Sequence, residues 1–306
     1  MQSKFKLSKK YLPFYPLYDN PESLIYLMED GSVYHNYTNF ISRPENRDLF
    51  KNYADKLQFG DSDTIRITSF SFSEGTLMVN YMPSRYSIYK GFSQIKHCFS
   101  HEEGLKEGRV GERLLSNHCG TGLFIECKRG GEGDNANDQV LIGMRPNSLV
   151  IDTHRLFRTY SASGSIDLTD GSPFETIRRE TFEELNYAID IKDVELISFG
   201  YDCQLGYFQF SFFYKSSLTY HEIVEMAGDA RDKIEYLSLD AITFSETKPE
   251  RALEEITEIP WEPSALYSLI FLYSRILPSE KMDWLRQEIE NKLMLNNYEN
   301  NYNIFD

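Results

Sequence analysis

The chain has 306 residues, of which 41% are hydrophobic, so it is long enough for a large buried core in one extended domain or in two. Lys and Arg total 32 against 47 Asp and Glu, which gives a net charge of −15. This balance argues against a protein that binds duplex DNA, which would need a basic face, and it suits either solubility or the binding of divalent cations.

The first half is predicted to form an N-terminal extension, residues 1–117. Residues 1 to about 60 read as irregular and aromatic-rich, with one short helix at 44–57. Residues 64–73 alternate with the period of a half-buried strand, and Glu74-Gly75 then turns the chain into a second strand at 76–81. A helix at 110–117 is expected to close this part.

The second half reads as an α/β (α+β) domain at 118–250, followed by C-terminal helices at 251–306. Strands and helices alternate along it in the order expected of a mixed sheet covered by helices. The expected strands are 122–127, 140–144, 194–203, 207–214 and 234–239, and the expected helices are 174–185, 220–227, 263–276 and 279–293. Loops are expected at 130–138 and at 161–173.

The cysteines and the chain start predict a cytoplasmic protein. Cys98, Cys119, Cys127 and Cys203 form no CxxC pair, so neither a zinc site nor a disulfide framework is predicted, and free thiols are expected. The N-terminus lacks the apolar segment of a signal peptide. The apolar run at 265–277 is too short and too polar to cross a bilayer, so no membrane partner is expected.

The segment Arg179-Glu180-Thr-Phe-Glu183-Glu184 carries the clearest chemical signal. On a helix, positions i, i+3 and i+4 share one face, so Glu180, Glu183 and Glu184 present three carboxylates side by side. A hard divalent cation would relieve their repulsion, and Mg²⁺ prefers such oxygen ligands together with substrate phosphates. Taken alone, the same pattern is also typical of a solvated helix face.

With its flanks, this segment resembles the Nudix box, G-x5-E-x7-R-E-U-x-E-E-x-G-U, where U is a bulky apolar residue. Arg179, Glu180, Glu183 and Glu184 match it, and Gly164 matches the first glycine if the loop is one residue longer, which puts Asp170 at the first acidic position. The resemblance covers residues 118–245 and implies a Nudix α/β/α sandwich with a mixed sheet. It further implies that the three glutamates bind Mg²⁺, with Mn²⁺ as an alternative, that Arg179 orients them, and that Gly164 lets the loop approach the phosphates.

Three positions depart from the pattern. Strict spacing puts Gly171 at the Glu position, Asn186 replaces the glycine after the helix, and Thr181 replaces an apolar residue. Asn is a mild change, because it also tolerates the left-handed conformation at a helix end. The missing Glu leaves two interpretations open, an active hydrolase and a Nudix-fold sensor that binds nucleotide without cutting it.

The layout is similar to that of animal UDP-glucose pyrophosphatases within the Nudix superfamily. The segments 83–93 and 263–275 look like diverged forms of two short motifs of that group. The resemblance implies hydrolysis of a nucleoside diphosphate sugar such as UDP-glucose to a nucleoside monophosphate and a sugar phosphate. The alternative substrates are ADP-ribose and NAD, and a homodimer is a further expectation.

Other residues are candidates for substrate binding. Arg145 and Arg158, with Arg155, could clamp phosphates, because guanidinium groups match phosphate oxygens, or they could be ordinary surface arginines. Tyr86, in an aromatic segment that also holds Tyr89 and Phe92, could stack on a base or belong to the core. The isolated His118 and His154 are more typical of structural histidines.

Overall fold

The computed structural model describes residues 14–19, 21–28, 51, 61–93, 117–128, 139–147, 155–202 and 206–295. All eleven strands in these ranges join one mixed sheet. Within the same ranges, none of the helices combines the length and the apolar character that crossing a membrane requires. Both cysteines described, Cys119 and Cys127, are buried free thiols.

The sheet has one main path and a short branch. The path runs β1-β9-β10-β5-β3-β4-β2, β8 pairs with β5, and β6 joins β5, β7 and β11. Strand β5 is parallel to β10 and antiparallel to β3, β6 and β8, so all parts of the sheet meet there. The strands are β1 (Phe14–Asp19), β2 (Ser23–Met28), β3 (Asp63–Ser73), β4 (Thr76–Arg85), β5 (His118–Lys128), β6 (Gln139–Met144), β7 (Arg158–Thr159), β8 (Ala162–Ser165), β9 (Val194–Asp202), β10 (Tyr207–Thr219) and β11 (Ser238–Thr243).

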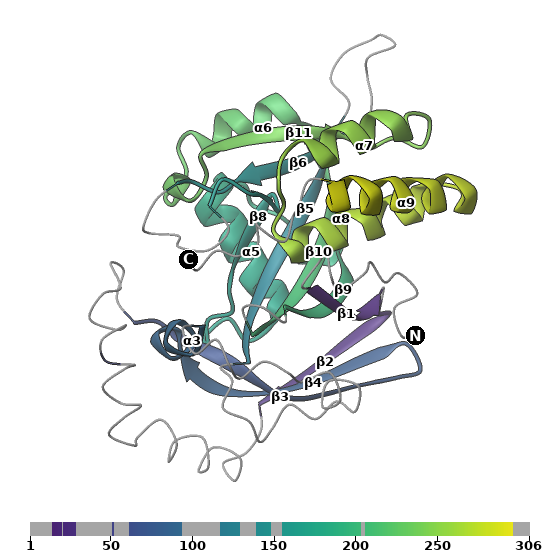
Figure 1. Ribbon diagram of the computed structural model, residues 1–306. Helices are drawn as coiled ribbons and strands as arrows, with labels where there is room; N and C mark the ends of the chain where they lie inside the picture. Colours follow the sequence, from purple (N-terminus) through teal and green to yellow (C-terminus); the bar gives the residue numbers. More distant parts are fainter. Residues whose placement is uncertain are drawn as a thin grey trace.

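Helices cover both faces of this sheet (Figure 1). On β5, Phe124 packs with residues of α7, α8 and α9, whereas Leu123 and Ile125 pack with residues of α5 and α6, because successive strand side chains point to opposite faces. The predicted α/β/α sandwich with a mixed sheet is therefore confirmed. The helices are α3 (Tyr86–Ser93), α5 (Pro173–Leu185), α6 (Tyr220–Ala227), α7 (Pro249–Glu258), α8 (Pro263–Ile276) and α9 (Ser279–Leu295), with the short 3-10 helices η1 (Ile191–Asp193) and η2 (Lys233–Glu235).

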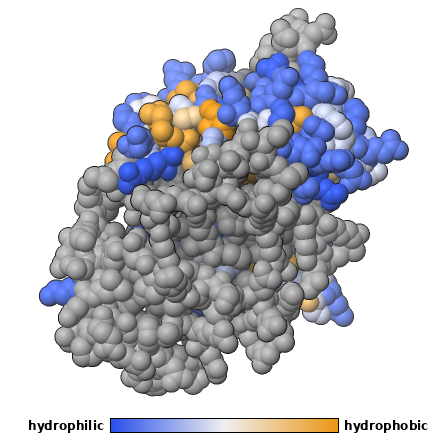
Figure 2. Space-filling model, in the orientation of Figure 1, coloured by the Kyte–Doolittle hydropathy of each residue, from blue (hydrophilic) through white to orange (hydrophobic). Residues whose placement is uncertain are grey.

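Figure 2 shows that the described surface around α6 and α7, at the top of the view, is mostly hydrophilic. This surface belongs to amphipathic helices such as α7, where Ala252, Leu253 and Ile256 are buried between polar neighbours.

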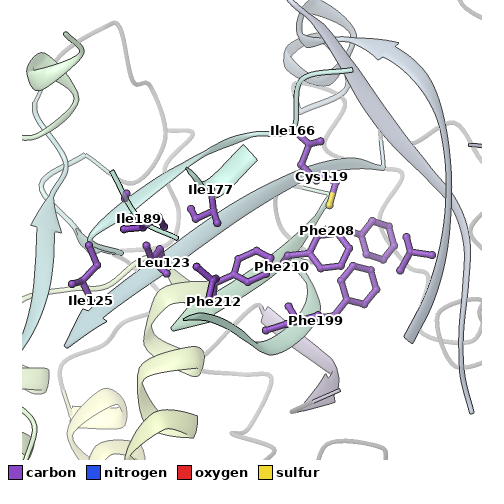
Figure 3. Close-up of a cluster of buried hydrophobic side chains, with 14 of the residues drawn as sticks. Cys119, Leu123, Ile125, Ile166, Ile177, Ile189, Phe199, Phe208, Phe210 and Phe212 are labelled. Atoms are coloured by element: carbon purple, nitrogen blue, oxygen red, sulfur yellow. The ribbon is translucent and has the colours of Figure 1, made fainter. Parts of the chain in front are cut away.

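A row of phenylalanines lies in the core cluster that also holds Ile177 of α5 (Figure 3). Phe208, Phe210 and Phe212 alternate along β10 and are fully buried, and the ring centroid of Phe199 lies 4.7 Å from that of Phe210. Phe174, at the start of α5, lies 4.9 Å from Phe212 between ring centroids. The same core therefore fixes the position of α5.

The N-terminal strands fold back over this core. Strands β1 and β2 follow one another in sequence but lie at opposite ends of the main path. Tyr18 of β1 stacks on Phe72 of β3 at 4.9 Å, and Tyr26 of β2 lies 6.3 Å from Phe210, both between ring centroids. The extension thus shares sheet and core with the second half, while the division at 117 and 250 stays a prediction.

Several predicted elements are confirmed, and the hairpin is the clearest. Strands β3 and β4 meet at Glu74 and Gly75, which have φ of 49° and 78°, the left-handed conformation that a tight hairpin turn needs. The strands on either side of the acidic motif are found as well, and α6 and α8 have the predicted bounds.

Other predictions were wrong or cannot be compared. The N-terminal residues are not wholly irregular, since they form β1 and β2. The loop at 161–173 contains the strand β8, and the strand expected at 234–239 begins later, as β11, after η2. The helices expected at 44–57 and 110–117 lie outside the described residues, apart from Lys51, which is helical, and Asn117, which is not.

Candidate functional site

Helix α5 carries the acidic motif, and local hydrogen bonds fix both of its ends. The Ser172 hydroxyl accepts a hydrogen bond from the backbone N–H of Glu175, and Pro173 occupies the first turn, where no N–H is needed. At the other end Asn186 has φ of 51° and ψ of 29°, the left-handed cap expected of an Asn in place of Gly. Buried Ile177 anchors the helix against the sheet.

Arg179 is the centre of the motif. Its Nε and Nη2 donate to the two carboxylate oxygens of Asp170 at 3.0 and 2.9 Å. Its Nη1 lies 2.8 Å from both Glu180 Oε1 and Glu183 Oε2. Asp170, rather than the adjacent Gly171, is therefore the loop residue that faces the arginine.

The carboxyl group of Glu180 lies against Gly164 of β8. A Cβ atom built on Gly164 would come within 2.1 Å of Glu180 Cδ. The glycine therefore leaves room for this carboxylate, a contact that differs from the expected approach of the loop to phosphates. The Glu180 side chain is only 12% exposed.

Glu184 is held by two donors from outside the helix. Its Oε2 accepts from the backbone N–H of Ser163 at 2.8 Å and from the Tyr236 hydroxyl at 2.8 Å. The Tyr236 ring lies on Gly143 of β6, where a Cβ would come within 2.1 Å of it. β6, β8 and the segment before β11 thus all contribute to placing one buried carboxylate.

Glu235 in η2 joins this cluster, and no residue spacing in the sequence pointed to it. The pKa of Glu180 is raised to about 8, mainly by burial and also by the negative charge of Glu235, although the charge of Arg179 lowers it. Burial and then the charges of Glu235 and Glu180 raise the pKa of Glu184 well above its ordinary value. Burial also raises the pKa of Glu235 itself, although Arg145 opposes this.

Asp170 behaves in the opposite way. Burial alone would raise its pKa, but the hydrogen bonds and charge of Arg179 lower it below the ordinary value. Asp170 is therefore held as an anion that fixes the arginine, whereas burial favours the neutral, protonated form of Glu180, Glu184 and Glu235.

This donor set fits a hard divalent cation. It offers only carboxylate oxygens, the ligands that Mg²⁺ and Mn²⁺ prefer, and their mutual repulsion is what a cation would remove. In the described part of the chain, no three acidic, His or Cys side chains already converge on a common position for an ion. Glu183 is bound by arginines instead, since Arg179 and Arg231 donate to its two oxygens at 2.8 and 2.9 Å.

Arg145 lies beside the cluster but is bound elsewhere. Its Nε and Nη2 donate to Glu262 Oε2 at 3.3 and 2.9 Å, and Glu262 also accepts hydrogen bonds from Thr159 and Tyr207. Its charge nevertheless acts on Glu235. Arg145 is therefore close enough to influence the acidic cluster and is oriented by a buried counter-ion.

Arg158 is not brought to the cluster. Its guanidinium donates to the backbone carbonyl of Glu255, lies 3.6 Å from Glu258 Oε2 and stands over the Trp261 ring. These contacts hold it in the packing between β7 and α7, and they give no support to a role in phosphate binding.

Tyr86 reaches the motif only indirectly. Its ring centroid lies 5.8 Å from that of His118, and His118 Nε2 is hydrogen-bonded to Ser165 Oγ at 2.9 Å. The Ser165 carbonyl in turn accepts from Arg179 at 3.3 Å. Half-buried Tyr86 thus contacts buried His118, which is joined to the acidic motif through Ser165.

Comparison with known proteins finds weak similarity. No family model matches the sequence, and no curated protein matches it significantly. One solved structure that it resembles is a MutT/nudix family protein from Enterococcus faecalis, with 14% identity and a TM-score of 0.31 over 41% of this chain and 43% of that chain. Another is a NUDIX hydrolase from Alicyclobacillus acidocaldarius, with 13% identity and a TM-score of 0.41 over 56% of this chain and 97% of that chain. A third is a bifunctional NMN adenylyltransferase/ADP ribose pyrophosphatase from Francisella tularensis, complexed with AMP and a Mn ion. It has 10% identity and a TM-score of 0.33 over 53% of this chain and 42% of that chain.

Proposed function

We propose that the protein is a metal-dependent pyrophosphohydrolase of the Nudix type, which cuts the diphosphate bridge between a nucleoside and a second group. One observation carries this proposal. Glu180 and Glu184 place two buried carboxyl groups, 12% and 2% exposed, on one helix face beside Glu235, and burial with neighbouring negative charge raises the pKa values of all three. Such a group of buried acids is rare unless it is paired or binds a metal, which would hold the groups as carboxylates.

The chemistry follows from the residues around this cluster. Glu180 and Glu184 would hold Mg²⁺, or Mn²⁺, together with Glu183 when its oxygens are released. A bound divalent ion would neutralise charge on the phosphate oxygens and favour attack by water at phosphorus. Glu235 lies outside the helix and has a raised pKa, which suits it to accept the proton of the attacking water at its carboxylate.

The proposed substrate is a nucleoside diphosphate sugar, with UDP-glucose first and ADP-ribose or NAD next. The support is the resemblance of segments 83–93 and 263–275 to motifs of UDP-glucose pyrophosphatases. In the fold these segments form α3 with the end of β4, and α8. Glu262, which precedes α8, holds Arg145 beside the cluster, so this end of the chain can influence what binds there.

A second candidate function is nucleotide binding without hydrolysis. The observation in its favour is that arginines bind both oxygens of Glu183, which could keep this carboxylate from a metal. Such a protein would be stabilised by nucleotide and would release no product.

Product release distinguishes the two functions. UDP-sugars, ADP-ribose, NAD, dinucleoside polyphosphates and nucleoside triphosphates would be incubated with Mg²⁺ or Mn²⁺ and the protein. Glu180→Gln is the test variant. Glu175→Gln is the matched control, because Glu175 lies on the same helix but pairs with the exposed Arg178.

The proposal predicts that one substrate class is cut only in the presence of metal. Activity should fall by a factor of about 100 or more in Glu180→Gln and stay close to the original value in Glu175→Gln. If no substrate is cut with either metal while nucleotide still raises the melting temperature, the hydrolase assignment is wrong and the binding function remains.

A further inference from the structure

Arg231 is bound to an oxygen of Glu183, a carboxylate that the proposed metal would need as a ligand. No motif in the sequence pointed to Arg231. Its Nη1 donates to Glu183 Oε1 at 2.9 Å, while Arg179 donates to the other oxygen, Oε2, at 2.8 Å. Glu183 is thus shared between two guanidinium groups that reach it from different parts of the chain.

The two arginines are held very differently. Arg179 also binds Asp170 through two hydrogen bonds, and its side chain is 33% exposed. The Arg231 side chain is 76% exposed, and apart from Glu183 its nearest acidic neighbour is Asp232, at 3.8 Å. An exposed ion pair contributes little free energy, so the contact of Arg231 is the one that can be exchanged.

The backbone keeps Arg231 at the site even when its side chain moves. The N–H of Asp232 donates to the backbone carbonyl of Glu183 at 2.9 Å, which fastens the segment between α6 and η2 to the last turns of α5. A long arginine side chain on this segment can leave the carboxylate and still reach a group bound beside it. Its planar donors match phosphate oxygens in pairs.

We propose that Arg231 competes with the divalent metal for Glu183 and, once the metal has displaced it, binds the diphosphate of the substrate. This inference rests on the proposed function, since it assumes that Glu183 becomes a metal ligand. It assigns one residue two successive partners, a carboxylate before the metal binds and a phosphate afterwards. It also means that removing the side chain should change metal binding and diphosphate binding in opposite directions.

The test measures both affinities without turnover. Mn²⁺ binding is followed by the electron paramagnetic resonance signal of free Mn²⁺. Binding of methylenediphosphonate, a diphosphate that is not hydrolysed, is measured by calorimetry at saturating Mn²⁺. The variants are Arg231→Gln and Arg231→Lys. The control is Arg178→Gln, which removes an exposed arginine that pairs with Glu175 on the same helix.

We expect Arg231→Gln to bind Mn²⁺ about threefold more tightly, as the loss of one exposed competing pair implies, and to bind methylenediphosphonate about tenfold more weakly. Arg231→Lys should bind Mn²⁺ like the original protein, because the charge remains, and should bind the diphosphate with intermediate affinity, because the paired donors are lost. Arg178→Gln should change neither.

A purely structural ion pair would give another result. If Arg231→Gln leaves both affinities unchanged, or weakens both together with the melting temperature, the inference is wrong while the proposed function still stands. The unsubstituted protein should bind Mn²⁺, and Glu183→Gln should weaken that binding. If no such Glu183-dependent binding is found, the proposed function fails and the inference fails with it.

Discussion

Glu180 and Glu184 are buried carboxyl groups whose pKa values are raised by burial and by neighbouring negative charge. A raised pKa in the folded state means that folding favours the protonated form. A cation bound between the carboxylates would favour the charged form instead. Protons and metal ions should therefore compete for this part of the protein.

The first prediction concerns pH. Because the pKa of Glu180 is raised from 4.5 to about 8, this residue stabilises the metal-free fold below its unfolded pKa, and the contribution is lost as pH rises through the folded pKa. The free energy of unfolding in chelator should fall between pH about 5 and about 8, and Mg²⁺ should restore more of it at the higher pH. Urea unfolding over this range measures both effects.

Glu180→Gln should reduce the pH dependence and the gain with Mg²⁺ together, because it removes the group that protons and metal share. Glu175→Gln is again the control. Equal pH profiles for Glu180→Gln and the unsubstituted protein would show that another group is responsible.

The second prediction concerns Gly164. Its substitution by Ala places a methyl group in the space of the Glu180 carboxyl, at 2.1 Å. Since the end of a flexible side chain can move, stability should fall by only about 1 kcal/mol or less, but Mn²⁺ affinity should fall about tenfold because a ligand has been displaced. Thermal unfolding and Mn²⁺ titration separate the two effects.

Gly171→Ala provides the contrast. Gly171 has φ of 73°, and no atom of the described part of the chain lies within 4 Å of its Cβ position. A side chain there should cost about 1 kcal/mol of stability through backbone strain and leave Mn²⁺ affinity unchanged. The reverse pattern in the two variants would contradict the described packing around Glu180.

The motif helix could be predicted from sequence because its residues are close in the chain. The spacing of Glu180, Glu183 and Glu184 indicated one helix face, and Asn186 indicated its end. The positions of Glu235 and Arg231 could not be predicted, because both residues belong to a later segment that only the fold brings to the site. Arg231, for example, follows Glu183 by 48 residues in the sequence. The sequence did not reveal that Arg158 packs against Trp261 and α7, since an arginine side chain fits a buried packing role as well as a phosphate.

At the level of elements, Glu262 connects the start of α8 to the strands beside the site. Its carboxylate accepts hydrogen bonds from Arg145, Thr159, Tyr207 and Ser264, and its side chain is 5% exposed. A buried ion pair of this kind is strongly destabilising when only one partner is removed. The contact therefore fixes where β6, β7 and α8 meet.

The third prediction follows from this pair. Glu262→Gln leaves the Arg145 charge buried without its counter-ion, so the free energy of unfolding should fall by about 3–5 kcal/mol. Arg145→Met should have a similar effect. The double variant should lose much less than the sum, because neither charge remains. Urea unfolding of all four proteins measures the coupling, and additive losses would contradict a direct pair.

Helices and strands whose apolar residues recur at a regular spacing could be predicted, and those without such a pattern could not. The apolar residues of α8 and the alternation of β3 indicate their structure directly. By contrast, β8 has the sequence ASGS, with no alternating apolar residues, and it forms a strand because β5 offers it backbone partners. Strands β1 and β2 likewise depend on partners far away in sequence, which composition cannot reveal.

At the level of the whole molecule, the N-terminal strands and the second half share one aromatic core. Tyr26 of β2 stacks on Tyr81 at 4.1 Å and lies 6.3 Å from Phe210 of β10, both between ring centroids. The extension should therefore unfold together with the rest of the chain, in a single cooperative transition.

The fourth prediction uses Tyr26 to test this coupling. Tyr26→Ala should lower the free energy of unfolding by about 3–5 kcal/mol, because it leaves a cavity between the strands and the core. Tyr26→Phe should be neutral or stabilising, because within the described residues the buried Tyr26 hydroxyl has no hydrogen-bond partner. Fluorescence and far-ultraviolet circular dichroism should report the same midpoint. Separate midpoints would mean that the extension unfolds independently.

The central claim is that the acidic cluster is a site for a divalent metal. The most direct measurement is the anomalous difference density of a crystal soaked in Mn²⁺. We predict a peak bounded by the carboxylates of Glu180 and Glu184, with Glu183 turned toward it and Arg231 displaced. A crystal that shows no peak there, while Mn²⁺ is bound elsewhere or not at all, would contradict the claim.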